Sequence, residues 1–216
     1  MKKYCVPLAV GASLFLASCS KTPGVKYPLS ADRLAWQPYR EGQVVRYVNS
    51  RTAATRTYTV TQVFDRLEKE RVGINWVPLL PGREPNEYQN VTVTMQRTDS
   101  AGVSFPVMDL VHNSDPNYAN GLFFAFAGWE TLGRAPLPLD ELNQGVPFDT
   151  TQYRGVKVVP AIKLGVATYR NVVEIKNLYT GAGNLGLPTI TRLYYAKQQG
   201  VLAFEDKATG LWYRLP

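Results

Sequence analysis

The stretch Val91-Thr92-Val93-Thr94-Met95-Gln96 indicates the fold class, because apolar and polar side chains alternate along it without a break. A period of two places successive side chains on opposite faces of a strand, so this pattern predicts a β-strand with one buried face and one wet face. Its β-branched valines and threonines also favour pleated structure. The same alternation recurs in short runs from Gly42 to the end of the chain.

Other strands are predicted on both sides of this stretch. They cover residues 43–49, 56–64, 72–76, 121–128, 155–162, 168–178, 189–196, 201–206 and 211–215. Turn-forming residues separate them, and turns at Gly200 and Gly210 join the last three into a meander. The sequence therefore predicts an all-β fold of predominantly antiparallel meander sheets, arranged either as a sandwich or as an open half-barrel.

A few segments interrupt this pattern. Ser30 is expected to cap a short helical turn over 31–34, and residues 140–145 form a second helical turn that ends at a glycine. The charged run 65–71 predicts a solvated turn. The phenylalanine-rich run 121–128 alternates poorly, which favours burial on both faces and a central place in the core. A division between two sheets near 134–150 stays open.

The beginning of the chain has the layout of an export signal. Lys2 and Lys3 precede an apolar run from Tyr4 to Leu16, which is shorter than the ~20 residues that a membrane-spanning helix needs. Residues 1–18 are therefore predicted to be a signal peptide that is removed. The run ends in Leu16-Ala17-Ser18-Cys19, which resembles the lipobox of bacterial lipoproteins.

That resemblance implies a lipidation site at Cys19. In lipoproteins a diacylglyceryl group is attached to the cysteine thiol, the chain is cut before it, and a fatty acid such as palmitate acylates the new amine. Because the remaining cysteine, Cys5, lies in the removed signal, the mature chain has no thiol for a disulfide. The residue after the anchor is Ser20, and not the aspartate that retains lipoproteins in the inner membrane. The resemblance thus implies an outer-membrane protein that faces the periplasm.

Downstream of Cys19 we expect a tether and then one domain. Residues 19–29 are rich in Ser, Thr, Pro and Gly and are predicted to be an irregular lipidated tether, while 30–216 form a single β-rich domain. The 24 Lys and Arg exceed the 17 Asp and Glu, but the basic residues are scattered and form no Lys/Arg block. Nucleic acid is therefore not an expected partner.

Two sequence features resemble sites of chemistry. Residues 181–186 match the glycine spacing of dinucleotide-binding loops, but Leu187-Pro188 and a strand pattern follow in place of the helix that binds the phosphates, so no cofactor is predicted. His112 lies near Asp109, Ser114 and Asp115, which leaves a hydrolase as a weak alternative. With one histidine and no free cysteine, no metal site is predicted.

The function expected from the sequence is binding without catalysis. The final meander, 193–215, resembles that of uncharacterised β-rich bacterial lipoproteins, a likeness that implies no activity. The outline is also similar to the half-barrel lipoprotein carriers of the periplasm, which hold acyl chains in an apolar concavity. We therefore expect a membrane-anchored binding or envelope-assembly module with a protein, glycan or lipid ligand. A carrier of an acyl chain or lipoprotein is the alternative, and a hydrolase around His112 is a weaker one.

Overall fold

The computed structural model describes residues 23–69, 84–99, 104–111, 121–124, 135–178 and 190–216. These residues form one sheet of twelve strands and two short helices. The strands are β1 (Lys26–Tyr27), β2 (Val44–Asn49), β3 (Thr55–Lys69), β4 (Glu87–Arg97), β5 (Ser104–Val111), β6 (Gly121–Phe124), β7 (Ala135–Pro138), β8 (Val156–Leu164), β9 (Ala167–Lys176), β10 (Ile190–Ala196), β11 (Gly200–Asp206) and β12 (Gly210–Arg214). The helices are α1 (Ala31–Leu34) and α2 (Leu139–Gln144).

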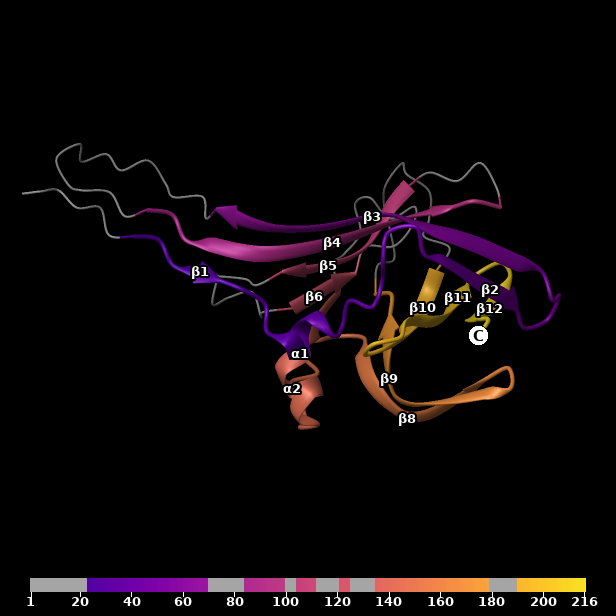
Figure 1. Ribbon diagram of the computed structural model, residues 1–216. Coiled ribbons are helices and arrows are strands. Elements are labelled where there is room, and N and C mark those ends of the chain that lie inside the picture. The colour runs from indigo at the N-terminus through magenta and orange to yellow at the C-terminus, as the bar shows by residue number, and fades with distance from the viewer. Residues whose placement is uncertain (1–22, 70–83, 100–103, 112–120, 125–134, 179–189) are drawn as a thin grey trace, which may run out of the picture.

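The sheet consists of two meanders, β2–β7 and β8–β12, joined where β2 pairs with β12, and it curls into a half-barrel (Figure 1). Its strand order is β7-β6-β5-β4-β3-β2-β12-β11-β10-β9-β8, and every neighbouring pair along this path is antiparallel. Strand β1 lies off the path and pairs with β4 in parallel. The predicted all-β fold is confirmed, and the open half-barrel is the correct one of the two predicted arrangements.

The two faces of the sheet bury different sets of side chains. The larger cluster combines the inner face with residues 29–39 and α2, and it includes Trp36, Tyr47, Val93, Leu137, Tyr195 and Phe204. The smaller cluster lies on the opposite face of β8–β12 and includes Leu164, Val172, Tyr194 and Leu202. Alternation along β10 divides the two sets, since Leu193 and Tyr195 join the first cluster and Tyr194 and Ala196 the second.

The two predicted helical turns are present and contact each other. The Oγ of Ser30 accepts the N–H of Arg33 at 3.3 Å, as the predicted cap requires. Helix α2 ends at Gly145 in the left-handed conformation, with φ of 67°. The helices are joined because Arg33 forms a salt bridge with Asp140 at 2.6 Å. This contact fixes residues 29–39 across the inner face.

Three local predictions are wrong. Residues 65–69 are not a turn, because they continue β3 and pair with β4 as far as Lys69 opposite Glu87. Here both faces of the β3–β4 pair are in contact with solvent, so charged residues fit without any alternation. Strand β6 is not central, since β7 alone separates it from one end of the strand order. The tether is not irregular throughout, because Lys26–Tyr27 form β1. The strand predicted at 72–76 lies outside the described residues.

Neither α1, with four residues, nor α2, with six, has the length or the apolar character to cross a bilayer. This finding concerns the helices in the part of the chain that the structure describes.

Candidate functional site

The aromatic side chains of the inner face pack against one another and form no open binding surface in the described part of the chain. Tyr47 contacts Phe204 edge-on with ring centroids 5.1 Å apart, and Trp212 stacks on Phe204 at 6.1 Å. Trp36 stacks on Tyr195 at 6.1 Å. All five of these side chains are buried. Trp36 and Trp212 are therefore core residues, while Trp76 and Trp129 lie outside the described residues.

The segment that follows α1 covers this face and is hydrogen-bonded to it. The hydroxyl of Tyr39 accepts the N–H of Val201 at 2.7 Å, and the hydroxyl of Tyr195 donates to the carbonyl of Trp36. Burial raises the pKa of Tyr39 to about 12 and the pKa of Tyr195 well above its usual value. These tyrosines are thus neutral, buried structural groups.

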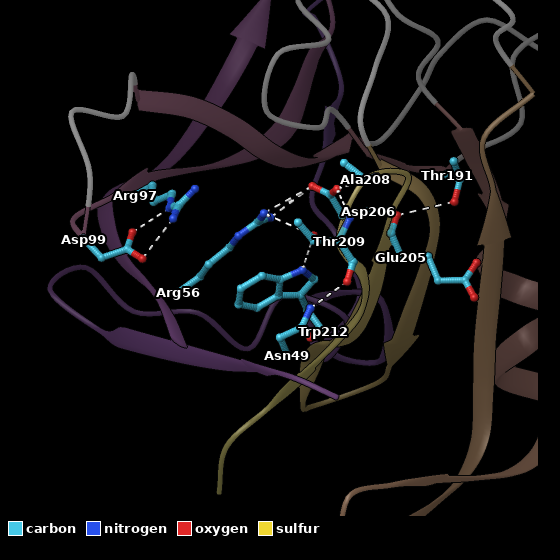
Figure 2. Close-up of polar contacts among 10 residues, drawn as sticks. All are labelled: Asn49, Arg56, Arg97, Asp99, Thr191, Glu205, Asp206, Ala208, Thr209 and Trp212. Carbon is cyan, nitrogen blue, oxygen red and sulfur yellow. Dashed lines mark hydrogen bonds and ion pairs between the residues drawn. The ribbon is translucent and has the colours of Figure 1, made fainter. Parts of the chain in front are cut away.

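A polar junction links β3 to the turn between β11 and β12 (Figure 2). Both terminal nitrogens of Arg56 donate to Oδ2 of Asp206, at 3.2 and 3.3 Å. Oδ1 of the same carboxylate accepts the backbone N–H groups of Ala208 and Thr209, each at 3.0 Å. The indole Nε1 of Trp212 donates to Oγ1 of Thr209 at 2.8 Å. The junction therefore joins β3 to β11 and β12 across the intervening strand β2 by direct side-chain contacts.

Its carboxylate is ionised and fully bonded. Burial opposes ionisation of Asp206, but the hydrogen bonds from Thr209 and Ala208, together with the charge of Arg56, hold its pKa below the usual value. A second pair lies nearby in Figure 2, where Nε of Arg97 donates to Asp99 at 2.6 Å and that bond lowers the pKa of Asp99. An acceptor with these partners is a poor general base, so the junction is structural.

Three adjoining recesses on the surface form the best candidate for a binding site, which we call the trough. It is lined by residues 38 and 40–46, by Gln198 and Gln199, and by 214–216, with Tyr169 and Leu202 at one side. The recesses have volumes of about 280, 530 and 320 Å³. They adjoin because the first shares Gln43 with the second and Arg214 with the third.

The lining of the trough is basic and rich in amides. Arg40, Arg46 and Arg214 contribute three guanidinium side chains, against one carboxylate side chain from Glu41. Arg40 and Arg46 are exposed, while Nη1 of Arg214 donates to the carbonyl of Gln199. Guanidinium and amide groups donate hydrogen bonds to acceptor oxygens, and guanidinium adds affinity for carboxylate or phosphate. The trough therefore suits a polar ligand that carries acceptor oxygens and negative charge.

The trough was not predicted from the sequence, because its residues come from the start of β2, the β10–β11 turn and the end of β12. Their spacing matches no known motif, so only the strand pairing brings them together. Cys19, His112 and the loop 181–186 lie outside the described residues, as do Ser114 and Asp115. Asp109 lies on β5, where it is opposite Thr92 of β4.

The described residues contain no group of three or more His, Cys, Asp or Glu arranged to hold a metal ion. The trough consequently offers binding groups from Arg and Gln side chains, and the junction offers structural ones. No protein-family model, curated protein or solved structure matches this chain.

Proposed function

We propose that this protein is a bacterial lipoprotein, anchored through Cys19 in the outer membrane and facing the periplasm, that binds a polar ligand without catalysing its conversion. The observation that carries the binding role is the trough, where three guanidinium groups from two separate segments lie beside three glutamine amides. The anchoring role is supported by the basic residues, apolar run and lipobox at the beginning of the chain. The trough would serve an envelope-assembly role by holding an anionic partner.

The alternative role as an acyl-chain carrier has less support. A carrier needs an apolar cavity of several hundred Å³ that stays open for the chain. In the described half-barrel, Trp36 and Tyr39 cover the inner face, and both are only 3% exposed. Side chains of the protein itself thus occupy the space in front of β10 and β11, where such a ligand would lie.

The anchor is tested by Cys19→Ala in cells of a bacterium with two membranes. Removing the thiol is expected to abolish acylation, so the protein should leave the membrane pellet on a high-salt wash while its domain stays folded. Ser18→Ala is the matched control, because it keeps a small residue before Cys19 and should be retained like the parent. A Cys19→Ala protein that still sediments with the washed membranes would contradict the proposed anchor.

Binding at the trough is tested by native mass spectrometry of the domain, released from the envelope by proteolysis after Cys19. We expect extra mass from a co-purified polar ligand, and its loss in the double variant Arg40→Ala/Arg46→Ala. The control Arg154→Ala/Lys207→Ala removes two exposed positive charges outside the trough and should keep the ligand. A parent domain without added mass would contradict the binding role, and loss in both double variants would show that only net charge matters.

A further inference from the structure

The segment just after the predicted anchor is built into the folded domain. The N–H of Val25 donates to Oδ1 of Asn86 at 3.0 Å, and the carbonyl of Val25 accepts the N–H of Glu87 at 2.9 Å. The ring of Tyr27 stacks on that of Tyr88, with centroids 4.9 Å apart and planes 4° from parallel. Farther along, the N–H of Leu29 donates to Oε1 of Gln89 at 2.8 Å. Residues 25–29 are thus held along β4.

Gly24 extends this close contact by one residue. A Cβ atom at this position would lie 2.9 Å from the carbonyl carbon of Pro85 and closer still to its oxygen. Real side chains do not approach backbone so closely, so a larger residue here would displace the segment. The docked part of the chain therefore begins at Gly24.

This segment is the third strand of an arm that projects from the body. Strand β5 pairs with β4 only between Asn90 and Gln96, whereas β1 pairs with Glu87 and Tyr88 on the side of β4 that β5 has left. The arm thus consists of β1, the first residues of β4 and the last residues of β3. Figure 1 shows β3 and β4 extending beyond β5 with β1 beside them, and the first described residues lie past the arm's far end.

The distances along the chain place the anchor at this far end. Cys19 precedes Gly24 by five residues, which span at most about 18 Å when fully extended. The trough lies at the level of Val60, whose N–H is bonded to the carbonyl of Gln43 at 2.9 Å. From Val60 to Lys69, β3 runs nine residues, or roughly 30 Å. The residues between Cys19 and Gly24 therefore span less than the distance along β3 from the arm's end to the trough. The domain cannot turn its trough toward the membrane unless β1 undocks from β4.

We propose that docking of residues 24–29 on β4 orients the domain, so that the end of the arm faces the lipid headgroups of the membrane that carries the anchor while the trough is held away from it. This inference rests on the proposed lipidation of Cys19. The headgroup-facing surface includes Lys26, whose side chain is 69% exposed, and Lys69 across the ribbon. The carboxyl terminus, which lines the trough, lies on the opposite side of the body from β1 in Figure 1.

The test measures the height of two sites above a bilayer. The acylated protein has no free thiol, so Lys69→Cys and Lys207→Cys each give one site for a donor dye. The proteins are reconstituted into vesicles of phosphatidylethanolamine and phosphatidylglycerol that contain a headgroup-labelled acceptor lipid. We expect energy transfer to be several-fold stronger from position 69 than from position 207. Lys69 is the last residue of β3, whereas Lys207 follows Asp206, which is bonded to Arg56 near the beginning of β3.

Undocking should remove this difference. Gly24→Val places a side chain against the backbone of Pro85 and is expected to make transfer from the two positions similar. Lys163→Val is the matched control, since it adds the same side chain at an exposed position of β8, away from the arm, and should preserve the difference. Circular dichroism of each variant checks that the half-barrel is intact.

The outcomes separate the two proposals. Mass spectrometry of the N-terminal peptide is done first, and an unacylated Cys19 would overturn both the anchor and the orientation. With acylation confirmed, equal transfer from positions 69 and 207 in the parent would overturn the orientation alone. A difference that survives Gly24→Val unchanged would overturn the role assigned to docking.

Discussion

The guanidinium carbon of Arg56 lies 4.0 Å from the centroid of the Trp212 ring, a cation–π contact between β3 and β12. Strand β2 lies between these two strands in the sheet, so the contact spans it. The same guanidinium is bonded to Asp206 at the end of β11, just before the turn that leads into β12. One side chain thus joins the first hairpin of the sheet to the final meander, which are 150 residues apart in sequence.

Arg56→Met should be strongly destabilising. The side chains of Arg56 and Asp206 are 14% and 6% exposed, so removing the cation leaves a buried carboxylate with fewer partners. Loss of one member of a buried pair costs about 3 kcal/mol in the free energy of unfolding. Urea unfolding followed by tryptophan fluorescence would measure it. Arg66→Met is the control, because Arg66 is 55% exposed and pairs with Glu68 on the arm; its loss should cost about 1 kcal/mol or less.

Asp206→Asn should make stability less sensitive to acid. The folded-state pKa of Asp206 is lowered, so its ionised form contributes stability above the unfolded-state pKa of about 4, and that contribution is lost as the pH falls through the folded-state pKa. The stability difference between the parent and Asp206→Asn should therefore be largest near neutral pH and shrink below about pH 4. Urea titrations at several pH values would test this, and a constant difference would contradict it.

The alternation of apolar and polar side chains predicted most of the strands. Each of these strands buries one face, so the period of two is visible within a few consecutive residues. It worked for β4 and for the meander β10–β12, where Tyr194 and Tyr195 face opposite ways. It failed at Asp65–Lys69 and Lys26–Tyr27, where strands of the arm are held by pairing and have little buried area. Backbone pairing leaves no periodic signal, so charged or proline-flanked strands are hidden from this kind of reasoning.

The candidate site was less predictable than the fold. The lipobox could be recognised because its residues are contiguous, whereas the trough combines Arg40, Arg46 and Arg214 from both ends of the domain. These arginines become neighbours only because β12 pairs with β2. The scattered basic residues that argued against nucleic acid in the sequence include the three that converge here.

The buried tyrosines predict a loss of stability in alkaline solution. Burial raises the pKa of Tyr39 to about 12 and that of Tyr47 well above its usual value, so both groups favour the folded state below pH 10. Because the unfolded-state pKa is about 10, this contribution is lost as the pH rises from there through the folded-state pKa. The free energy of unfolding should fall steeply above about pH 10.

Tyr39→Phe separates the two contributions of this hydroxyl. At neutral pH it should cost about 1–3 kcal/mol, because the buried N–H of Val201 loses its acceptor. Above about pH 10 the variant should lose stability less steeply than the parent, since one group with a raised pKa is gone. Urea unfolding at each pH, with tyrosinate absorbance as a second signal, would measure both slopes. Parallel slopes would contradict a titrating role for Tyr39.

Gly200→Ala and Gly42→Ala should differ, although both glycines have a left-handed backbone. Their φ values are 82° and 78°, so alanine costs about 1–2 kcal/mol at either position. At Gly42 a Cβ would meet no atom within 4 Å, but at Gly200 it would lie 2.6 Å from Cζ of Tyr39. The Tyr39 ring would have to move away from Val201, which adds about 1–3 kcal/mol. Thermal unfolding of the two variants measures the difference. Equal costs would mean that the Tyr39 ring moves aside freely. Residues 29–39 would then cover the inner face more loosely than the hydrogen bond between Tyr39 and Val201 indicates.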